Sequence, residues 1–224
     1  MDKLKPLVFG YKVINHTTDE IYTIPSAELI GVYGSDNLIC NAARVSHGTK
    51  RKFKRTDEEL IEHLLRNEHW SPFEFGDVHF LLTVPKYVAI QMMRHRTAKV
   101  SEKSLRYSTT YEVEFIDTDL SYGNMMNLII ADAVVTYYDS VQSANRETNR
   151  IPREVARKVL PMCFMTEVQY KIDIRNFFNM YKQRRAGGHA QPETQIVAES
   201  MWNLAEPHFP ITFKKYTEIY GINK

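Results

Sequence analysis

The chain has 224 residues, 43% of them hydrophobic, and its 29 basic side chains nearly balance its 27 acidic ones. This length and composition can bury one sizeable core, so we expect a single domain over residues 1–224. The near neutrality argues against a nucleic-acid partner or an anionic membrane surface, and any preference for anions must therefore be local.

The cysteine and histidine content and the apolar stretches restrict the class of protein further. Cys40 and Cys163 are too few for a disulfide framework or a cysteine-rich metal site, and the eight histidines form no HExxH pattern. The most apolar stretches are interrupted, by Pro85 and Lys86 and by Asp132, well short of the roughly 20 residues that span a bilayer. The N-terminal segment also lacks an apolar signal core. We therefore expect a soluble cytoplasmic protein with neither a bound metal nor a membrane partner.

The first half of the chain is predicted to hold a helix, a strand and a second helix. Thr56 begins a capping-box pattern before apolar residues at helical spacing, which predicts a helix over residues 56–67. β-branched and aromatic residues predict a strand over residues 77–84. Pro85 then suits the first turn of a helix that ends near Arg94.

Residues 94–106 carry a cluster of positive charge that follows an apolar run: RHRTAKVSEKSLR holds three arginines, two lysines and a histidine beside one carboxylate. These cations begin at the end of the predicted apolar helix and so have a rigid base. They can therefore form a preorganised anion site rather than a solvated run of charge.

The second half is predicted to be mainly helical. Paired prolines bracket one short helix, alternation predicts one strand, and two glycines at 187 and 188 separate the last two helices. In chain order we expect a long helix over 122–144, a short helix between Pro152 and Pro161, a strand over 168–172, a helix over 174–184 and a final helix over 192–204. Long helices mixed with non-consecutive strands favour an α+β (α/β-type) domain.

The charged residues suggest a phosphorylated ligand, because arginine forks match phosphate geometry and stay charged in any environment. A surface of weak, hydrated ion pairs is the alternative for any one arginine taken alone. No glycine-rich nucleotide loop is present, and Cys163 lies among apolar residues, which predicts an inert thiol. Any chemistry should therefore come from an organic cofactor. The candidate phosphate ligands are Arg94, Arg96, Arg106, Arg157 and Arg184, with Ser104 as a neutral donor.

This arrangement resembles the flavin-dependent thymidylate synthases. Their signature is RHR, seven residues, then Ser, and the chain has RHR at 94–96 followed by Ser104. Further segments match in the family's order over residues 43–193: ARVS at 43–46, HWSPFEF at 69–75, PREVARKVLP at 152–161 and RNFFNMYKQR at 175–184, with HAQPE after it.

The resemblance implies methylation of dUMP to dTMP, a step of dTTP biosynthesis. It implies 5,10-methylenetetrahydrofolate as the carbon donor, reduced FAD as the hydride source and NADPH as the reductant that recharges the flavin, with no enzyme nucleophile. It also implies a twisted, mainly antiparallel sheet flanked by long helices, and a homotetramer whose subunits share active sites.

The resemblance also implies roles for individual residues. Arg184 would favour the ionised uracil, with Ser104 and His69 as the other catalytic residues. Substrate binding would involve Gln91, Met92, Met93, Arg94, Glu102, Lys103, Ser104, Leu105, Arg106, Arg157 and Arg184. FAD binding would involve Ser46, Ser71, Glu74, Arg94, His95, Arg96, Glu102, Asp173, Ile174, Arg175 and Asn179.

Three departures from the family pattern bear on these roles. Lys99 and Ser101 replace the usual Ser and Asn of the spacer, and Asp173 replaces the usual Asn or His before the FAD-binding arginine. The loop after Arg184 is one residue longer than usual, so Arg185 competes for the role at the uracil. Spacing from Arg175 and Asn179 favours Arg184.

Two other functions fit the same residues. One is a related flavin enzyme that acts on another pyrimidine nucleotide or transfers a different one-carbon unit. The other is a non-catalytic RNA- or nucleotide-binding module, in which the basic strip binds phosphates and aromatic residues such as Tyr107 and Phe177 stack on bases. Binding alone gives no reason for Gln91, Glu102 and Glu154 to keep the family spacing, so we favour the enzyme.

Overall fold

The computed structural model describes residues 10–15, 20–45, 55–107, 114–116, 129–130, 132–133, 135–137, 139–140, 151–185, 187 and 189–222. The chain divides into two compact units. The first comprises Met1–Ser26, Thr83–Arg94 and Ser101–Val168, and the second comprises Ala27–Leu82, His95–Val100 and Gln169–Lys224.

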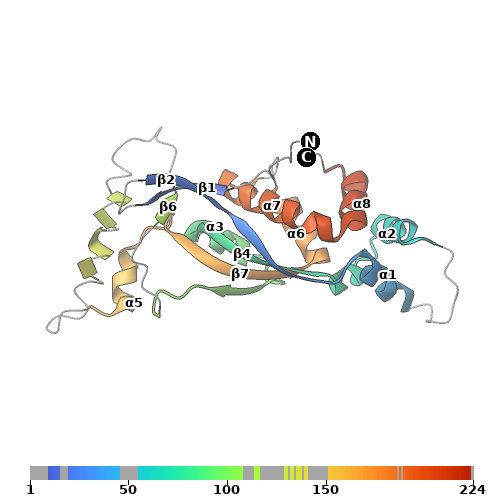
Figure 1. Cartoon of the computed structure of the whole chain (residues 1–224), viewed down its shortest axis with the longest axis horizontal. Helices are drawn as coiled ribbons and strands as arrows, with labels where there is room; N and C mark the ends of the chain where they lie inside the picture. The colour runs from blue at the N-terminus through green and yellow to red at the C-terminus, as the bar shows by residue number, and fades with distance from the viewer. Residues whose placement is uncertain are drawn as a thin grey trace, which may run out of the picture. The chain divides into compact units, whose positions relative to one another are not determined.

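Strands and helices alternate irregularly along the described residues (Figure 1). The strands are β1 (Gly10–Asn15), β2 (Glu20–Pro25), β3 (Ala27–Tyr33), β4 (Asp77–Pro85), β5 (Lys99–Glu102), β6 (Glu114–Ile116) and β7 (Met165–Asp173). The α-helices are α1 (Asp36–Val45), α2 (Asp57–Arg66), α3 (Lys86–Met93), α5 (Arg153–Ala156), α6 (Ile174–Arg184), α7 (Pro192–Ala205) and α8 (Pro210–Tyr220). Short 3-10 helices are η1 (Ser71–Phe75), η3 (Arg157–Val159) and η4 (Glu206–His208).

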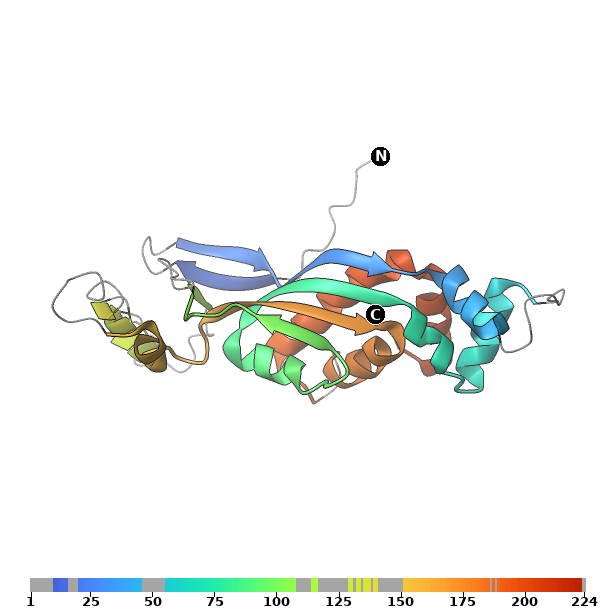
Figure 2. The same ribbon diagram turned by 90° about the horizontal axis from the view of Figure 1, so that it is seen from below.

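The main sheet is antiparallel and has the strand order β3-β4-β7-β5, while β2, β1 and β6 form a smaller sheet. Ala27 of β3 lies opposite Leu82 of β4, and the register shifts between Leu29 and Gly31, where a β-bulge interrupts the pairing. Figure 2 shows β7 (orange) running beside β5 (green). Buried and more exposed residues alternate along β4 and β7, as expected of strands with one face in the core. The predicted α+β class is confirmed.

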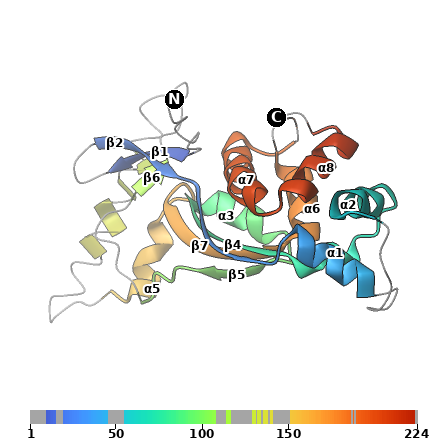
Figure 3. The same ribbon diagram turned by 45° about the vertical axis from the view of Figure 1, so that its right-hand side comes forward.

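Aromatic side chains build the core of the second unit. Phe178 of α6 stacks on Tyr216 of α8 with ring centroids 3.8 Å apart, and Trp202 of α7 meets Phe213 of α8 edge-on at 4.6 Å. All four side chains are at most 3% exposed. Figure 3 shows α6, α7 and α8, the three helices that supply these rings. Each ring buries a large apolar area, so this cluster fixes the face that α6 turns inward.

A smaller core lies in the first unit. Ile130, Tyr137 and Ala156 are buried, and Leu160, Cys163 and Phe164 pack against them. Burial raises the pKa of the Cys163 thiol. This is the apolar environment that the sequence predicted for Cys163.

Most of the predicted elements are confirmed at their expected positions. The capping box of α2 is present: Glu59 N–H donates to Thr56 Oγ1 at 3.3 Å and Thr56 N–H donates to Glu59 Oε2 at 2.8 Å. The strand at 77–84, the helix that follows Pro85, the strand at 168–172 and the helix at 174–184 correspond to β4, α3, β7 and α6. The short helix between Pro152 and Pro161 corresponds to α5 and η3. The predicted helix over 122–144 lies largely outside the described residues, and those described between 129 and 140 are helical.

One prediction about helix order was wrong. The helix over 192–204 is present as α7, but it is not the last, because α8 follows it. The sequence of α8, PITFKKYTEIY, is rich in β-branched and aromatic residues, which have only modest helix propensity. Its helical form depends instead on tertiary packing of Phe213 and Tyr216, which local propensity does not reveal.

The start of α8 is also held by a residue distant in sequence. Asp36, the first residue of α1, accepts hydrogen bonds from the backbone N–H groups of Ile211 at 2.8 Å and Thr212 at 3.0 Å. The Asp36 side chain is 7% exposed, so these bonds form where water cannot replace them.

Among the described residues, no helix is long and apolar enough to cross a membrane.

We predict that Asp36→Ala lowers the free energy of unfolding by about 1–3 kcal/mol, because it leaves one buried and one part-buried N–H donor without an acceptor. Asp36→Asn should lose less, since its carbonyl oxygen still accepts one bond. Urea denaturation measures the effect. Glu28→Ala, which removes an exposed carboxylate of the same unit, is the control and should change stability by less than about 0.5 kcal/mol. Equal stability of Asp36→Ala and the parent protein would contradict this role for Asp36.

Candidate functional site

The predicted site residues separate between the two units according to their predicted ligand. Residues assigned to the substrate lie in the first unit, with the exception of Arg184. Residues assigned to the cofactor lie in the second unit, with the exceptions of Arg94 and Glu102. Ser46 lies outside the described residues.

In the first unit, α3 carries four predicted substrate residues to its C-terminus. The helix ends at Met93, and the N–H of Arg94 closes it by donating to Gln91 O at 3.3 Å. The Arg94 side chain is exposed, whereas Gln91 and Met93 are half-buried. Met92 is 0% exposed, so its side chain belongs to the core and only its backbone could face a ligand.

The segment after β5 forms a tight turn around Ser104. Its Oγ accepts the Arg106 N–H at 3.4 Å, and its carbonyl accepts the Tyr107 N–H at 3.1 Å. The guanidinium of Arg106 lies over the Tyr107 ring, 5.5 Å from the centroid. A cation–π contact orients a guanidinium without cancelling its charge. Because Arg106 is also exposed, its guanidinium is suited to bind an anion. Arg157 is also exposed, at the C-terminus of α5.

Glu102, at the end of β5, has protein partners for its carboxylate. Lys86 Nζ donates to its Oε1 and Oε2 at 2.7 and 2.6 Å, and Thr166 Oγ1 donates to Oε1 at 3.0 Å. Sequence reasoning assigned Glu102 to the ligands and missed Lys86 and Thr166. No local signal could have found them, because their contacts depend on how α3, β5 and β7 meet.

In the second unit, the structure joins two segments that were 89 positions apart in the sequence. Arg184 Nε donates to His95 Nε2 at 3.0 Å. Because Nε2 accepts this bond, the imidazole is neutral and carries its proton on Nδ1. Arg185 instead ends α6, with its N–H donating to Tyr181 O at 2.9 Å. Of the two competing arginines, Arg184 is therefore the one beside the RHR segment.

Burial, and secondarily the charge of Arg184, lower the pKa of His95 from 6.5 to about 4. The imidazole is thus neutral at physiological pH. Since the folded pKa is depressed, protons favour the unfolded chain, and stability is lost as the pH falls from about 6.5 through 4. A neutral His95 leaves the positive charge of Arg184 uncancelled by this contact.

One face of α6 lines a pocket of about 390 Å³. Arg175 and Asn179, predicted from spacing to share a helix face, both line it. Arg175 also forms an ion pair with Glu74 of η1, another predicted cofactor residue. The pocket thus combines cationic and amide donors with aromatic walls. Its lining residues are Glu68, Trp70, Arg175, Asn176, Phe178, Asn179, Lys182, Tyr216 and Tyr220.

Two predicted cofactor residues have structural roles at the start of α6. Asp173 is the N-cap, and its carboxylate accepts from the N–H of Asn176 at 2.9 Å and from Asn176 Nδ2 at 2.7 Å. Ile174 has a fully buried side chain, and its N–H donates to Gly76 O at 2.9 Å. Any contact of these two residues with a cofactor would have to use other atoms.

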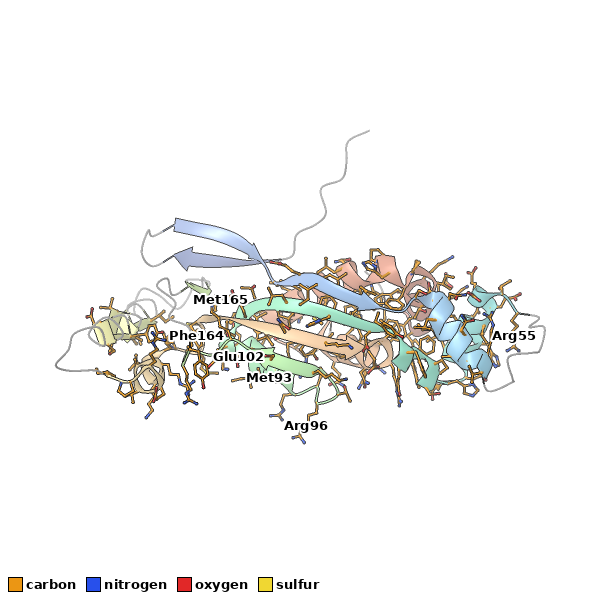
Figure 4. The ribbon with its side chains drawn as sticks, turned by 60° about the horizontal axis from the view of Figure 1, so that its bottom comes forward. Arg55, Met93, Arg96, Glu102, Phe164 and Met165 are labelled. Atoms are coloured by element: carbon orange, nitrogen blue, oxygen red, sulfur yellow. The ribbon has the colours of Figure 1, made fainter. Side chains whose placement is uncertain are left out.

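Three further predicted residues lie on the surface, whereas Lys103 and Leu105 are half-buried. His69, Ser71 and Arg96 are exposed, and the His69 ring meets His63 edge-on at 6.0 Å. Figure 4 shows the Arg96 side chain projecting away from the ribbon. Lys99 and Ser101, the two spacer departures, are exposed on β5. Within the described part of the chain, no group of three or more His, Cys, Asp or Glu residues could hold a metal ion.

Comparison with known proteins identifies the family. The Thy1 family, described as thymidylate synthase complementing protein, matches residues 28–211. The chain is 32% identical over 211 residues to the flavin-dependent thymidylate synthase of Ruegeria pomeroyi, covering 85% of this chain and 70% of that one. It is 33% identical over 216 residues to the enzyme of the same name from Treponema denticola, covering 87% of this chain and 80% of that one.

A solved structure gives the same result at the level of the fold. A UMP/dUMP methylase, PolB from Streptomyces cacaoi bound with 5-Br UMP, superposes with a TM-score of 0.72 at 26% identity, covering 86% of this chain and 93% of that one. The proteins matched here are enzymes that act on pyrimidine nucleotides. The chain belongs to the Thy1 family, the flavin-dependent thymidylate synthases.

We predict that Arg184→Ala raises the pKa of His95 part of the way from about 4 toward 6.5. The rise should be partial, because burial is the larger cause of the depression and remains in the variant. An NMR titration of the His95 ring measures the change. Arg185→Ala is the matched control and should leave the His95 pKa unchanged. A His95 pKa that is the same in Arg184→Ala as in the parent protein would refute the contact.

Proposed function

We propose that the protein is a flavin-dependent thymidylate synthase that methylates dUMP to dTMP for dTTP synthesis. The observation that carries this proposal is the bond between His95 and Arg184, because it joins the two segments that resemble the family most specifically. Family membership and the nucleotide-binding neighbour support the same function.

Arg184 is proposed to stabilise the uracil ring of dUMP as its N3 anion. A nearby cation favours an anion most strongly where water is scarce, and Arg184 is half-buried. The neutral imidazole of His95 orients the guanidinium without itself neutralising it. Ionisation would raise the electron density at carbon 5 of the uracil, the atom that receives the one-carbon unit.

The phosphate of dUMP is proposed to bind at the exposed turn that contains Ser104 and Arg106, with Arg94 and Arg157 as further ligands. The Ser104 turn fixes the backbone, and the Tyr107 ring orients the Arg106 guanidinium. A fixed fork loses less freedom on binding an anion, which favours affinity. Gln91, Met93, Lys103 and Leu105 would complete the substrate site, and Met92 would contribute only its backbone.

The α6 pocket fits part of an FAD molecule in the chemistry of its donors. Arg175 and Lys182 can neutralise a pyrophosphate, Asn179 can donate to it, and Trp70 offers a half-exposed ring on which a planar group can stack. Ser71, Glu74, His95 and Arg96 would contribute further contacts. When bound, FAD would supply the hydride after reduction by NADPH, and 5,10-methylenetetrahydrofolate would supply the carbon near His69.

No enzyme nucleophile is proposed. Cys163 is half-buried against an apolar cluster, and burial raises its thiol pKa, which disfavours the reactive thiolate. Cys40 is 0% exposed, and burial raises its thiol pKa to about 12.

The proposed organisation of the protein is a single cytoplasmic domain assembled as a homotetramer. Size-exclusion chromatography with light scattering measures the assembly.

A second candidate function differs in the substrate. The structural neighbour PolB is a UMP/dUMP methylase, so methylation of a ribonucleotide or of a modified pyrimidine nucleotide is the alternative. Parallel assays with dUMP and UMP distinguish the two. Turnover of UMP at a rate equal to or above that of dUMP would favour the alternative.

The decisive experiment is anaerobic turnover of dUMP with 5,10-methylenetetrahydrofolate and NADPH by the FAD-loaded protein, with dTMP measured as product. The purified protein should be yellow or take up FAD non-covalently. A colourless protein with no flavin spectrum after incubation with FAD would refute the proposed cofactor. A flavin-loaded protein that makes no dTMP would refute the proposed reaction.

We predict that Arg106→Ala weakens dUMP binding by roughly 1.5–3 kcal/mol, the usual loss for a charge-assisted hydrogen bond. Isothermal titration calorimetry measures the affinity. Arg66→Ala removes an exposed arginine of α2 that pairs with Glu62, and it serves as the control with unchanged affinity. If the two variants bind dUMP equally well and remain folded, the phosphate is held elsewhere.

We also predict that Arg184→Ala lowers dTMP formation at least about a hundredfold, the loss expected when a preorganised charge is removed from a reacting group. FAD content should change much less. Cys163→Ala should retain turnover, with a modest loss of stability from packing. Abolished turnover in folded, FAD-loaded Cys163→Ala would instead assign the chemistry to a thiol nucleophile, and loss of activity only in Arg185→Ala would transfer the uracil role to that residue.

A further inference from the structure

Lys86, Glu102 and Thr166 form one interaction cluster in the first unit, here called the Glu102 cluster. The side chains of Lys86 and Glu102 are 28% and 21% exposed, and Thr166 is 5% exposed. Glu102 Oε1 accepts from both Lys86 Nζ and Thr166 Oγ1, and Oε2 accepts from Lys86 Nζ. Removing one partner of an ion pair this sheltered from water costs much more folding free energy than removing one partner of a surface pair.

The Glu102 cluster lies where three elements are joined by their backbones as well. The N–H groups of Lys86 and Tyr87, at the start of α3, donate to Phe164 O at 2.9 Å and Met162 O at 3.1 Å. Lys103 N–H, just beyond β5, donates to Glu167 O of β7 at 2.9 Å. Figure 4 labels Glu102 together with Met165, the first residue of β7, and Phe164, which precedes it. The start of α3, the end of β5 and the start of β7 are therefore fixed to one another.

Two of these elements lead to the proposed phosphate ligands. The C-terminus of α3 carries Arg94, and the turn that contains Ser104 and Arg106 begins two residues after Glu102. A lateral shift of this turn would move the Arg106 fork away from the phosphate position. Binding groups need support from packed neighbours to keep their geometry.

The charge of Glu102 matters as well as its position. A carboxylate two to four residues from a phosphate site would repel a dianionic nucleotide. Lys86 cancels that charge while holding the carboxylate in place. The same residue therefore orients the turn and removes an unfavourable electrostatic interaction.

We infer that Lys86 and Thr166 are positioning residues for nucleotide binding, and that Glu102 acts through them by fixing the Ser104 turn rather than by binding the nucleotide directly. This inference rests on the proposed function, because it takes dUMP as the ligand. It assigns a role to Lys86 and Thr166, which no sequence motif indicated.

The test is a set of variants assayed for dUMP binding by calorimetry on the FAD-loaded protein. Lys86→Met keeps the aliphatic stem and removes the charge, and it should weaken dUMP binding roughly tenfold or more. Lys86→Arg restores the ion pair and should bind within about threefold of the parent protein. Thr166→Val keeps the shape, removes one hydrogen bond and should weaken binding about two- to fivefold.

The double variant Lys86→Met with Glu102→Gln separates positioning from direct binding. If Glu102 acts through Lys86, the double variant binds dUMP more tightly than Lys86→Met and recovers part of the loss, because the uncancelled charge has been removed. If Glu102 binds the nucleotide independently, the losses of Lys86→Met and of the single variant Glu102→Gln multiply in the double variant, and the inference is overturned. A purely structural role for Lys86 would not give this recovery in the double variant.

Lys171→Met is the matched control. Lys171 pairs with Asp77 at 2.9 Å across β7 and β4, with side-chain exposures of 38% and 23%, but neither residue leads to a proposed phosphate ligand of dUMP. Its dUMP affinity should equal that of the parent protein. If Lys86→Met does not fold, the Thr166→Val result decides the matter, and unchanged affinity there overturns the inference.

The outcome also separates this inference from the proposed function. Failure of the unmodified, FAD-loaded protein to bind dUMP overturns the proposed substrate and this inference with it. Normal binding by the unmodified protein together with normal binding by folded Lys86→Met overturns this inference alone.

Discussion

The position of β7 between β4 and β5 is the constraint on which the rest of the structure depends. A strand paired on both sides has no freedom to slip, because a shift of one residue would turn its buried side chains outward. β7 alternates Thr166, Val168, Tyr170 and Ile172 toward the core, and its last residue caps the helix that follows. The strand therefore determines how α6 is rotated about its own axis. Phe177 and Phe178 point into the aromatic core, so Arg175 and Asn179 must point out of it.

Two cations of the candidate sites, Lys86 and Arg184, are held in different ways. Lys86 is neutralised by a carboxylate, with which it holds a backbone turn in place. Arg184 contacts a neutral imidazole whose pKa burial depresses, so that this contact orients the cation without cancelling it. The difference suits different tasks, because a supporting cation should be cancelled near an anion site, whereas a cation that stabilises a developing anion must keep its charge.

Sequence reasoning located elements whose signals are local, and the elements that it missed include one that depends on tertiary contacts. Short stretches of chain were enough to predict three features: the capping box of Thr56, the alternation along β7, and the helix face shared by Arg175 and Asn179. α8 was missed because its residues prefer strands, and only Asp36 and the aromatic core make it a helix. The Glu102 cluster was missed for the same reason, since its partners are 16 and 64 positions away. The pairing of Arg184 with His95 spans 89 positions, and only the family resemblance placed these residues at one site.

The aspartate at position 173 is the departure that most directly tests whether a flavin pyrophosphate can be accommodated. Both of its carboxylate oxygens accept hydrogen bonds from Asn176, and it lies at the positive end of the α6 dipole, so much of its negative charge is offset within the helix. The Arg175 guanidinium, two residues further on, lines the pocket and faces a second carboxylate, Glu74, in a half-exposed pair. A half-exposed pair is weak enough for a phosphate to replace the carboxylate as the partner of the guanidinium. The aspartate therefore contributes to the start of α6 without opposing an anionic cofactor, and Arg175 remains able to bind one.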